Sequence, residues 1–233
     1  MAYQTIPPSN SSPDWLTRVW NRVKGINSTL TREPVASNCT NIASDLLVGV
    51  ATGTGDVSAL STQTEGGGIE ITSGGTAGGI RTATLGVSTA AAAFVSNSRT
   101  KVWAVYTHFK VVTAPASGAE RVILCSLLDV TNDVGLGILA STSTTNWAFT
   151  NGAAGGSGVD TTVAFDTNWH EGLLYNDGTN VSIFVDWVQI FTGLSSTYLA
   201  TTQGVSRTFA YNAAVNGTVN HYMNRWAMFT TEP

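Results

Sequence analysis

Charged side chains are scarce in this sequence. Asp, Glu, Lys and Arg make up 11% of its 233 residues, against about a quarter in an average soluble domain. The 11 basic residues are scattered and the net charge is −4, so the chain lacks the basic patch that binds DNA or RNA. We therefore expect no nucleic-acid partner. The remaining Thr-, Ser-, Asn- and Gly-rich composition favours a protein that works in a fixed assembly or outside a cell.

Cysteines and long apolar runs are scarce as well. Cys39 and Cys125 are the only cysteines, and neither has the CxxC or histidine spacing of a metal site. We expect buried free thiols, and a disulfide between the two is left open. The N-terminal segment has neither the basic nor the apolar region of a secretory signal peptide, and no apolar run reaches membrane-spanning length. We expect no membrane association.

The common catalytic patterns are missing. The 15 acidic residues contain no E-x-D-x-E run, which would supply the paired carboxylates that glycoside hydrolysis needs. Glu171 and Asp186 lie on neighbouring predicted strands and could meet, but we interpret them as structural or exposed. His108, His170 and His221 have no partner at metal-binding spacing and are interpreted as hydrogen-bonded strand residues. No catalytic residue is predicted, and we expect the protein not to be an enzyme.

A strong hairpin pattern lies at Phe165–Ile190. A strand is predicted at Asn168–Tyr175, a turn at Asn176–Asn180 and a second strand at Val181–Ile190. Gly178 within the turn accepts positive φ without a Cβ penalty. One face of the second strand carries Val181, Ile183, Val185 and Trp187, and the other face is largely apolar as well, so we expect this strand to be buried inside a two-sheet structure.

Further short strands follow the same logic of alternating apolar residues between turn signals. The strongest is Lys101–Val112, in which even-numbered and odd-numbered residues face opposite ways. The other candidates are 68–72, 80–87, 121–130, 135–140, 147–149, 161–165, 198–202, 205–212 and 222–229, with a loop at 151–158. About ten to twelve strands with a turn every 8 to 12 residues predict a single all-β sandwich, to which we assign residues 41–233.

Residues 1–40 do not show this strand pattern. Residues 1–12 predict an extended arm, Ser12 and Pro13 predict a helix start, Gly25 is a candidate helix end, and 31–40 read as a linker. The helix would present an apolar stripe that is too short to be stable alone. The stripe either packs on the chain's own sandwich or mediates attachment and oligomerisation. The residues assigned to attachment or oligomerisation are Trp15, Leu16, Val19, Trp20 and Val23.

The hairpin also carries a family resemblance. The order Trp169-His170, Leu173-Leu174-Tyr175, Asp177-Gly178 and Val181–Asp186 resembles the "W-H … D-G … V-x-(L/I)-(Y/F)-V-D-G" hairpin of concanavalin A-like and laminin G-like jelly-roll domains. Trp187 stands where that pattern has Gly. The resemblance implies a jelly-roll β-sandwich and sugar binding through exposed aromatic side chains. The candidate sugar platforms are Trp147, Trp187, Tyr198 and Tyr211.

The resemblance further implies that a Ca²⁺ site deserves consideration. One oxygen-rich loop contains Asp129, Asn132 and Asp133, and a second contains Asn176 and Asp177. Each offers two or three oxygen ligands where Ca²⁺ takes six to eight, and turn chemistry explains the same residues. Ca²⁺ is left open, and no other cofactor is expected.

An anchor-like start followed by a low-charge jelly roll resembles bacteriophage virion proteins. This resemblance predicts a non-enzymatic structural protein on the particle surface, a capsid decoration that displays a lectin-like sandwich. Its partners would be major capsid or tail proteins and copies of itself, as a homotrimer. One alternative is a carbohydrate-binding adhesin or receptor-binding tail-fibre module for host or environmental glycans. A second alternative is a polysaccharide-cleaving enzyme.

Overall fold

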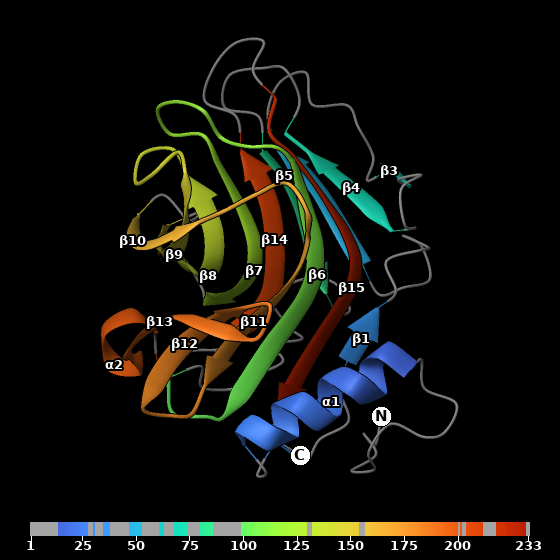
Figure 1. Ribbon diagram of the computed structural model, residues 1–233, viewed down its shortest axis with the longest axis vertical. Helices are drawn as coiled ribbons and strands as arrows, with labels where there is room; N and C mark the ends of the chain where they lie inside the picture. The colour runs from blue at the N-terminus through green and yellow to red at the C-terminus, as the bar shows by residue number, and fades with distance from the viewer. Residues whose placement is uncertain are drawn as a thin grey trace.

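The fold is seen in a computed structural model (Figure 1). It describes residues 14–27, 30, 35–37, 47–52, 61–62, 68–73, 80–85, 99–129, 132–153, 157–199, 201, 204–211 and 218–231. These residues form two antiparallel sheets and two helices. Neither helix of the described chain is long and apolar enough to cross a membrane.

Sheet A has eight strands. Its order is β13-β12-β11-β6-β15-β4-β3, and β1 pairs with β15 beside this path. The strands are β13 (Val188–Leu194), β12 (Asn180–Val185), β11 (Trp169–Asn176), β6 (Trp103–Thr113), β15 (Asn220–Thr230), β4 (Ile69–Thr72), β3 (Ser61–Thr62) and β1 (Val35–Ser37).

Sheet B has seven strands in the order β10-β9-β8-β7-β14-β5-β2. The strands are β10 (Gly158–Ala164), β9 (Asn146–Ala153), β8 (Asn132–Leu139), β7 (Arg121–Asp129), β14 (Gly204–Tyr211), β5 (Ile80–Leu85) and β2 (Leu47–Thr52). Because the last long strand, β15, pairs with β6 and β4, the end of the chain closes the sheet that its earlier part begins. The predicted jelly-roll β-sandwich is therefore confirmed.

The main core lies between the two sheets. Strand β6 shows how alternation builds it, because Trp103, Val105 and Phe109 are fully buried in this core while Ala104 and Tyr106 face the other way. Both faces of β6 were predicted correctly. Strands β11 and β12 contribute to the same core, chiefly through Leu174, Val181, Ile183 and Val185.

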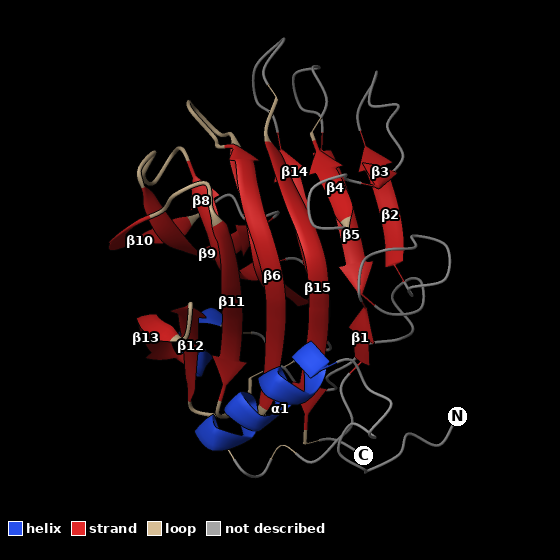
Figure 2. Cartoon of the chain, turned by 45° about the vertical axis from the view of Figure 1, so that its right-hand side comes forward, coloured by secondary structure: helices blue, strands red, loops and turns tan. Residues whose placement is uncertain are grey.

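Helix α1 (Asp14–Ile26) covers part of the outer face of sheet A, the face turned away from sheet B. Gly25 does not end the helix, which continues for one more residue. In Figure 2, α1 crosses β6 and β15 near one end of each strand. The apolar stripe therefore packs on the chain's own sandwich, one of the two arrangements that the sequence allowed.

Four local predictions were wrong. The strand at Val181–Ile190 is two strands, because Asp186 and Trp187 form a turn between β12 and β13 with φ values of 50° and 69°. The strand predicted at 198–202 is not found at its described residues, because Tyr198 ends the short helix α2 (Ser195–Tyr198) and residues 199 and 201 are not in a strand. The segment interpreted as a linker contains β1. The predicted loop at 151–158 is shorter, because β9 continues to Ala153.

Candidate functional site

The outer face of sheet A has two halves. One half, which we call the covered half, lies under α1 (Figure 2). Its buried sheet residues are apolar or aromatic. Its sheet residues are Ala104, Tyr106, Leu173, Tyr175, Ala227 and Phe229. No element that the structure describes lies over the other half, which we call the open half. The same strands β11, β6 and β15 run through both halves.

Polar and aromatic side chains form the open half. Its residues come from three neighbouring strands, and all of them are half-buried. They are His108, Lys110, Trp169, Tyr222, Asn224 and Arg225. The strand register pairs Lys110 with Trp169 on one side and Tyr222 on the other, and it places His108 opposite Arg225.

A β-bulge in β15 brings two consecutive residues to this face. Met223 pairs with Phe109 and Arg225 pairs with His108, so Asn224 is the extra residue between them. Bulges re-aim side chains and are common next to active sites. The bulge packs against Gly68, whose φ is +127° and where an added Cβ would lie 2.1 Å from the Met223 carbonyl oxygen. Only glycine fits at this contact.

His108 pairs with Glu171 of β11 on one side and with Arg225 of β15 on the other. Its Nδ1 atom lies 2.5 Å from Asn224 Oδ1, and because an amide oxygen only accepts hydrogen bonds, Nδ1 carries the proton. Burial lowers the pKa of His108, with the charge of Arg225 adding to this effect and the Asn224 hydrogen bond opposing it. The neutral ring therefore has an unprotonated Nε2 atom. The Trp169 ring stacks on the imidazole at 4.9 Å between centroids.

Glu171 lies at the border between the two halves. Its carboxylate accepts hydrogen bonds from Arg18 at 2.6 Å, from the Tyr106 hydroxyl at 3.0 Å and from the Trp187 indole N–H, and Arg22 lies 3.6 Å away. Burial would raise the pKa of Glu171, but the hydrogen bonds from Trp187 and Tyr106 and the charge of Arg18 hold it below its ordinary value. Glu171 is therefore a carboxylate that ties α1 to the sheet and is not a proton donor.

The suspected pair of Glu171 and Asp186 has a structural role. Asp186 Oδ1 accepts the backbone N–H of Glu171 at 2.9 Å, and its Oδ2 lies 2.7 Å from His170 Nδ1. His170 Nε2 lies 2.9 Å from Asp166. These contacts fix the turn beside β12. His221 is fully buried between the sheets, where burial lowers its pKa to about 3.

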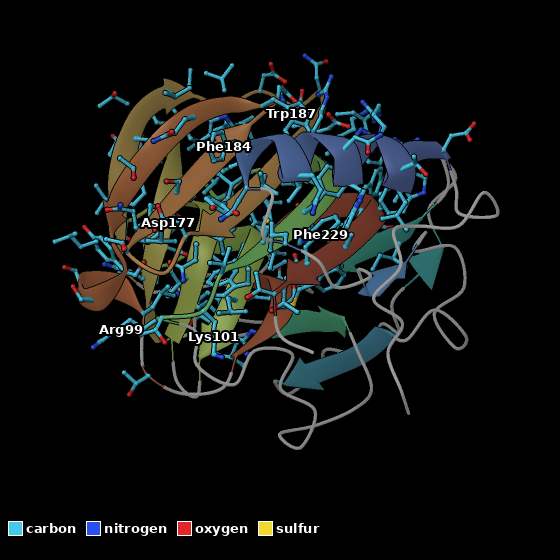
Figure 3. All side chains as sticks on the ribbon, turned by 90° about the horizontal axis from the view of Figure 1, so that it is seen from below. Arg99, Lys101, Asp177, Phe184, Trp187 and Phe229 are labelled. Carbon is cyan, nitrogen blue, oxygen red and sulfur yellow. The ribbon has the colours of Figure 1, made fainter. Side chains whose placement is uncertain are left out.

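The four predicted sugar platforms are not brought together. Trp147 is 2% exposed in the main core, so it presents no face to a sugar and that assignment was wrong. Trp187 stacks against Tyr106, and the Arg22 guanidinium lies 4.8 Å from its ring. In Figure 3 it lies beside α1. Tyr198 lies on α2 and contacts Phe149, and Tyr211 lies on sheet B under Arg121.

The residues assigned to attachment or oligomerisation contact the chain's own sheet A. Leu16, Val19, Trp20 and Val23 are buried against the covered half. Trp15 stacks on Tyr106 at 6.0 Å. Their apolar surface is thus already used within the chain, and intermolecular contacts through them stay a prediction.

The described carboxylates of the two oxygen-rich loops make contacts within the protein. Asp133 is fully buried and paired with Arg207, and Asp177 accepts backbone N–H groups of its own turn. Within the described ranges, no group of three or more His, Cys, Asp or Glu residues is placed to hold a metal. Cys125 is a buried free thiol, and burial raises its pKa to about 12. Cys39 lies outside the described residues.

Sequence reasoning missed the open half. His108 was interpreted as a hydrogen-bonded strand residue, and Trp169 was not among the candidate sugar platforms. One signal was available, because the outward face of Lys101–Val112 carries His108 and Lys110 after an apolar start. The bulge at Asn224 leaves no mark in the sequence.

No protein-family model and no curated protein matches this sequence. Solved structures are similar in fold. A protein of unknown function from Shewanella oneidensis MR-1 matches with a TM-score of 0.56 and 14% identity over 96% of this chain and 95% of that one. The Crh5 transglycosylase in complex with NAG matches with a TM-score of 0.58 and 14% identity over 86% and 85%. The alginate lyase AlyC3 matches with a TM-score of 0.51 and 9% identity over 70% and 75%.

Two of these three structures are enzymes that share the fold. This finding contradicts the prediction that the protein is not an enzyme, which rested on the absence of sequence patterns for catalysis. At such low identities the similarity shows the fold alone. The chemistry must therefore be argued from the open half itself.

Proposed function

We propose that the protein binds a polysaccharide on the open half of the outer face of sheet A. The observation that carries this proposal is the bulge at Asn224, which places Asn224 and Arg225 beside His108 and the stacked ring of Trp169. Packing does not require these polar groups there, since the same face is apolar under α1. A polar, aromatic patch without a packing role is best explained by a ligand.

The side-chain types suit a carbohydrate. A sugar ring has apolar C–H faces that pack on an aromatic ring, and hydroxyl groups that hydrogen-bond to amides and charged groups. Trp169 supplies the aromatic ring, and Asn224, Lys110 and Tyr222 supply polar partners. Two solved structures of similar fold are complexes with carbohydrates, NAG in one and dimannuronate in the other, which supports a carbohydrate ligand.

The position of α1 gives the ligand a direction. Because α1 crosses the strands at one end of the face (Figure 2), a polymer cannot run along the strands past it. A polysaccharide would instead cross the strands beside α1. It would follow the register row that runs from Trp169 through Lys110 to Tyr222 and on to Glu70 of β4.

A glycan array followed by calorimetry tests the proposal with two variants. Trp169→Ala removes the aromatic ring of the open half, and Tyr211→Ala removes a predicted platform on sheet B. We expect Trp169→Ala to weaken binding about tenfold or more, which corresponds to about 1.4 kcal/mol of binding free energy. Tyr211→Ala should leave binding unchanged. Absence of glycan binding by the wild type would overturn the proposal.

The location on a bacteriophage particle stays a proposal from the sequence. A polysaccharide ligand is compatible with it, because a surface protein of a particle can meet host or environmental glycans. Electron microscopy of antibody-labelled particles would test the location and distinguish shell, tail and free protein. Copurification of major capsid or tail proteins and the mass of the free protein would test the predicted partners and homotrimer.

A further inference from the structure

We infer that the open half cleaves polysaccharides of uronic acids by β-elimination, with His108 as the base. This inference rests on the proposed function and adds to it a reaction and a substrate class. The observations behind it are the charge around the site, the tautomer of His108 and the engagement of the nearby carboxylates.

The charge around the site favours an acidic ligand. Although the chain carries a net charge of −4, α1 and the outer faces of β4, β6, β11 and β15 carry a surplus of positive charge among the described residues. The basic residues are Arg18, Arg22, Lys24, Lys110 and Arg225, and the acidic ones are Asp14, Glu70 and Glu171. Lys110 and Arg225 lie in the open half itself, where a substrate carboxylate would be drawn to them.

His108 is prepared to accept a proton. The Asn224 amide oxygen holds the proton on Nδ1, so Nε2 offers a lone pair. Trp169 stacks on one face of the ring and limits its rotation. A base that is fixed in one tautomer by a neighbouring acceptor is a common catalytic arrangement.

The carboxylates near the site are committed to other contacts, which argues against hydrolysis. Hydrolysis of a glycosidic bond needs one carboxylic acid as proton donor and a second carboxylate as base or nucleophile. Glu171 is held ionised by Trp187 and Tyr106. Glu70 accepts hydrogen bonds from Asn220 and Thr72. β-Elimination needs a single base to remove a proton, and it does not need the pair of carboxyl groups that hydrolysis uses.

The proposed step balances within the site. Lys110 or Arg225 binds the uronate carboxylate and so acidifies the C5–H bond. Nε2 of His108 takes the C5 proton, the electron pair forms the C4=C5 double bond, and the C4–O bond breaks. The leaving oxygen takes a proton from the Tyr222 hydroxyl. Solvent then removes the proton from His108 Nε2 and returns one to Tyr222, which restores both groups. No oxidant, reductant or metal is consumed.

Polygalacturonate and alginate serve as probes, and methyl-esterified pectin serves as the matched neutral polymer. We expect the wild type to release products whose new double bond, conjugated with the carboxylate, absorbs ultraviolet light, and to bind esterified pectin more weakly. His108→Gln should lower the rate about 10²–10⁴-fold while retaining polyuronate binding. A His108→Gln protein that keeps its rate would overturn the inference.

A second variant separates catalysis from a structural role. Asn224→Asp places a carboxylate beside His108, alongside the existing charges of Arg225, Glu171 and Arg18. It should stabilise the imidazolium and move the acidic limb of the pH–rate profile upward by about one pH unit or more. An unmoved limb would contradict His108 as the base.

The outcomes distinguish this inference from the proposed function. Binding of polyuronates without any double-bond product would overturn the elimination and leave the proposed function intact. Preferential binding of neutral glycans would overturn the substrate class alone. Absence of binding to every glycan would overturn both.

Discussion

The covered and open halves of the outer face of sheet A are built by the same strands. The covered half carries apolar and aromatic side chains, whereas the open half carries polar and aromatic ones. On β6 the outward residues Ala104 and Tyr106 pack under α1, and two residues further along His108 lies in the open half. On β15, Ala227 and Phe229 are fully buried, whereas Arg225 is half-buried. The boundary between the halves follows the edge of α1, with Glu171 on it.

The difference separates packing from ligand binding on one surface. Apolar outward residues occur where a helix covers them, because burying them stabilises the fold. The polar residues next to them gain nothing comparable from folding. Substitutions in the covered half should therefore reduce stability, and substitutions in the open half should reduce ligand binding with little effect on stability.

The largest effect is expected from Val19→Asp in α1. Val19 is fully buried against the covered half, and a carboxylate there has no partner. We expect the free energy of unfolding to fall by about 3–5 kcal/mol, measured by urea denaturation. Thr17→Asp, at an exposed position of the same helix, is the matched control and should change stability by less than about 0.5 kcal/mol. Equal effects would mean that α1 does not pack on sheet A.

An intermediate effect is expected from Glu171→Gln at the boundary. The amide keeps a hydrogen-bond acceptor but loses the ion pair with Arg18, so we expect a loss of about 1 kcal/mol. Because the folded-state pKa of Glu171 lies below the ordinary 4.5, its contribution is present above that value and is lost as pH falls through the folded pKa.

The prediction for Glu171→Gln is tested by measuring the midpoint of urea denaturation as a function of pH. Wild-type stability should decline as pH falls below about 4.5, partly through Glu171, and Glu171→Gln should remove that part of the decline. A variant with the wild-type pH dependence would show that Glu171 does not link α1 to the sheet. The sharp boundary between the halves would then need another explanation.

The smallest effect on stability is expected from Lys110→Ala in the open half. It should change the free energy of unfolding by less than about 0.5 kcal/mol while weakening polyuronate binding and reducing its salt dependence. Lys101→Ala removes the same charge on the side of the molecule away from α1 (Figure 3) and should leave binding unchanged. If both lysine variants bind alike, the open half does not select its ligand by charge.

Much of the fold could be predicted from alternation and turn residues. The two faces of β6 could be predicted from the sequence, because the even-numbered and odd-numbered residues of Lys101–Val112 form two sets of different side chains. The hairpin from β11 to β12 followed from Asp177 and Gly178. The turn after β12 was missed because it places Trp187 at positive φ, a conformation that costs about 1–3 kcal/mol for such a residue. Contacts with Glu171, Arg22 and Tyr106 hold it there.

The open half could not be predicted in the same way. Its residues are 59 or more positions apart between β6 and β11. They are still further apart between β6 and β15, so only the pairing of these strands brings them together. Trp169 resembles a core residue by type, and the sequence does not reveal which face of sheet A is left uncovered. The helix stripe was recognised from its spacing, whereas its docking surface depended on Tyr106 and Leu173 lying on adjacent strands.

The contact between Gly68 and β15 also bears on how this protein can vary. Gly68 has no side chain and takes no part in any chemistry, yet every replacement would collide with the main chain at Met223 and Asn224. A mutational scan scored by activity would accordingly rank this glycine alongside His108. Relatives that keep the open half must therefore also keep Gly68, a residue that a search for reactive side chains would not find.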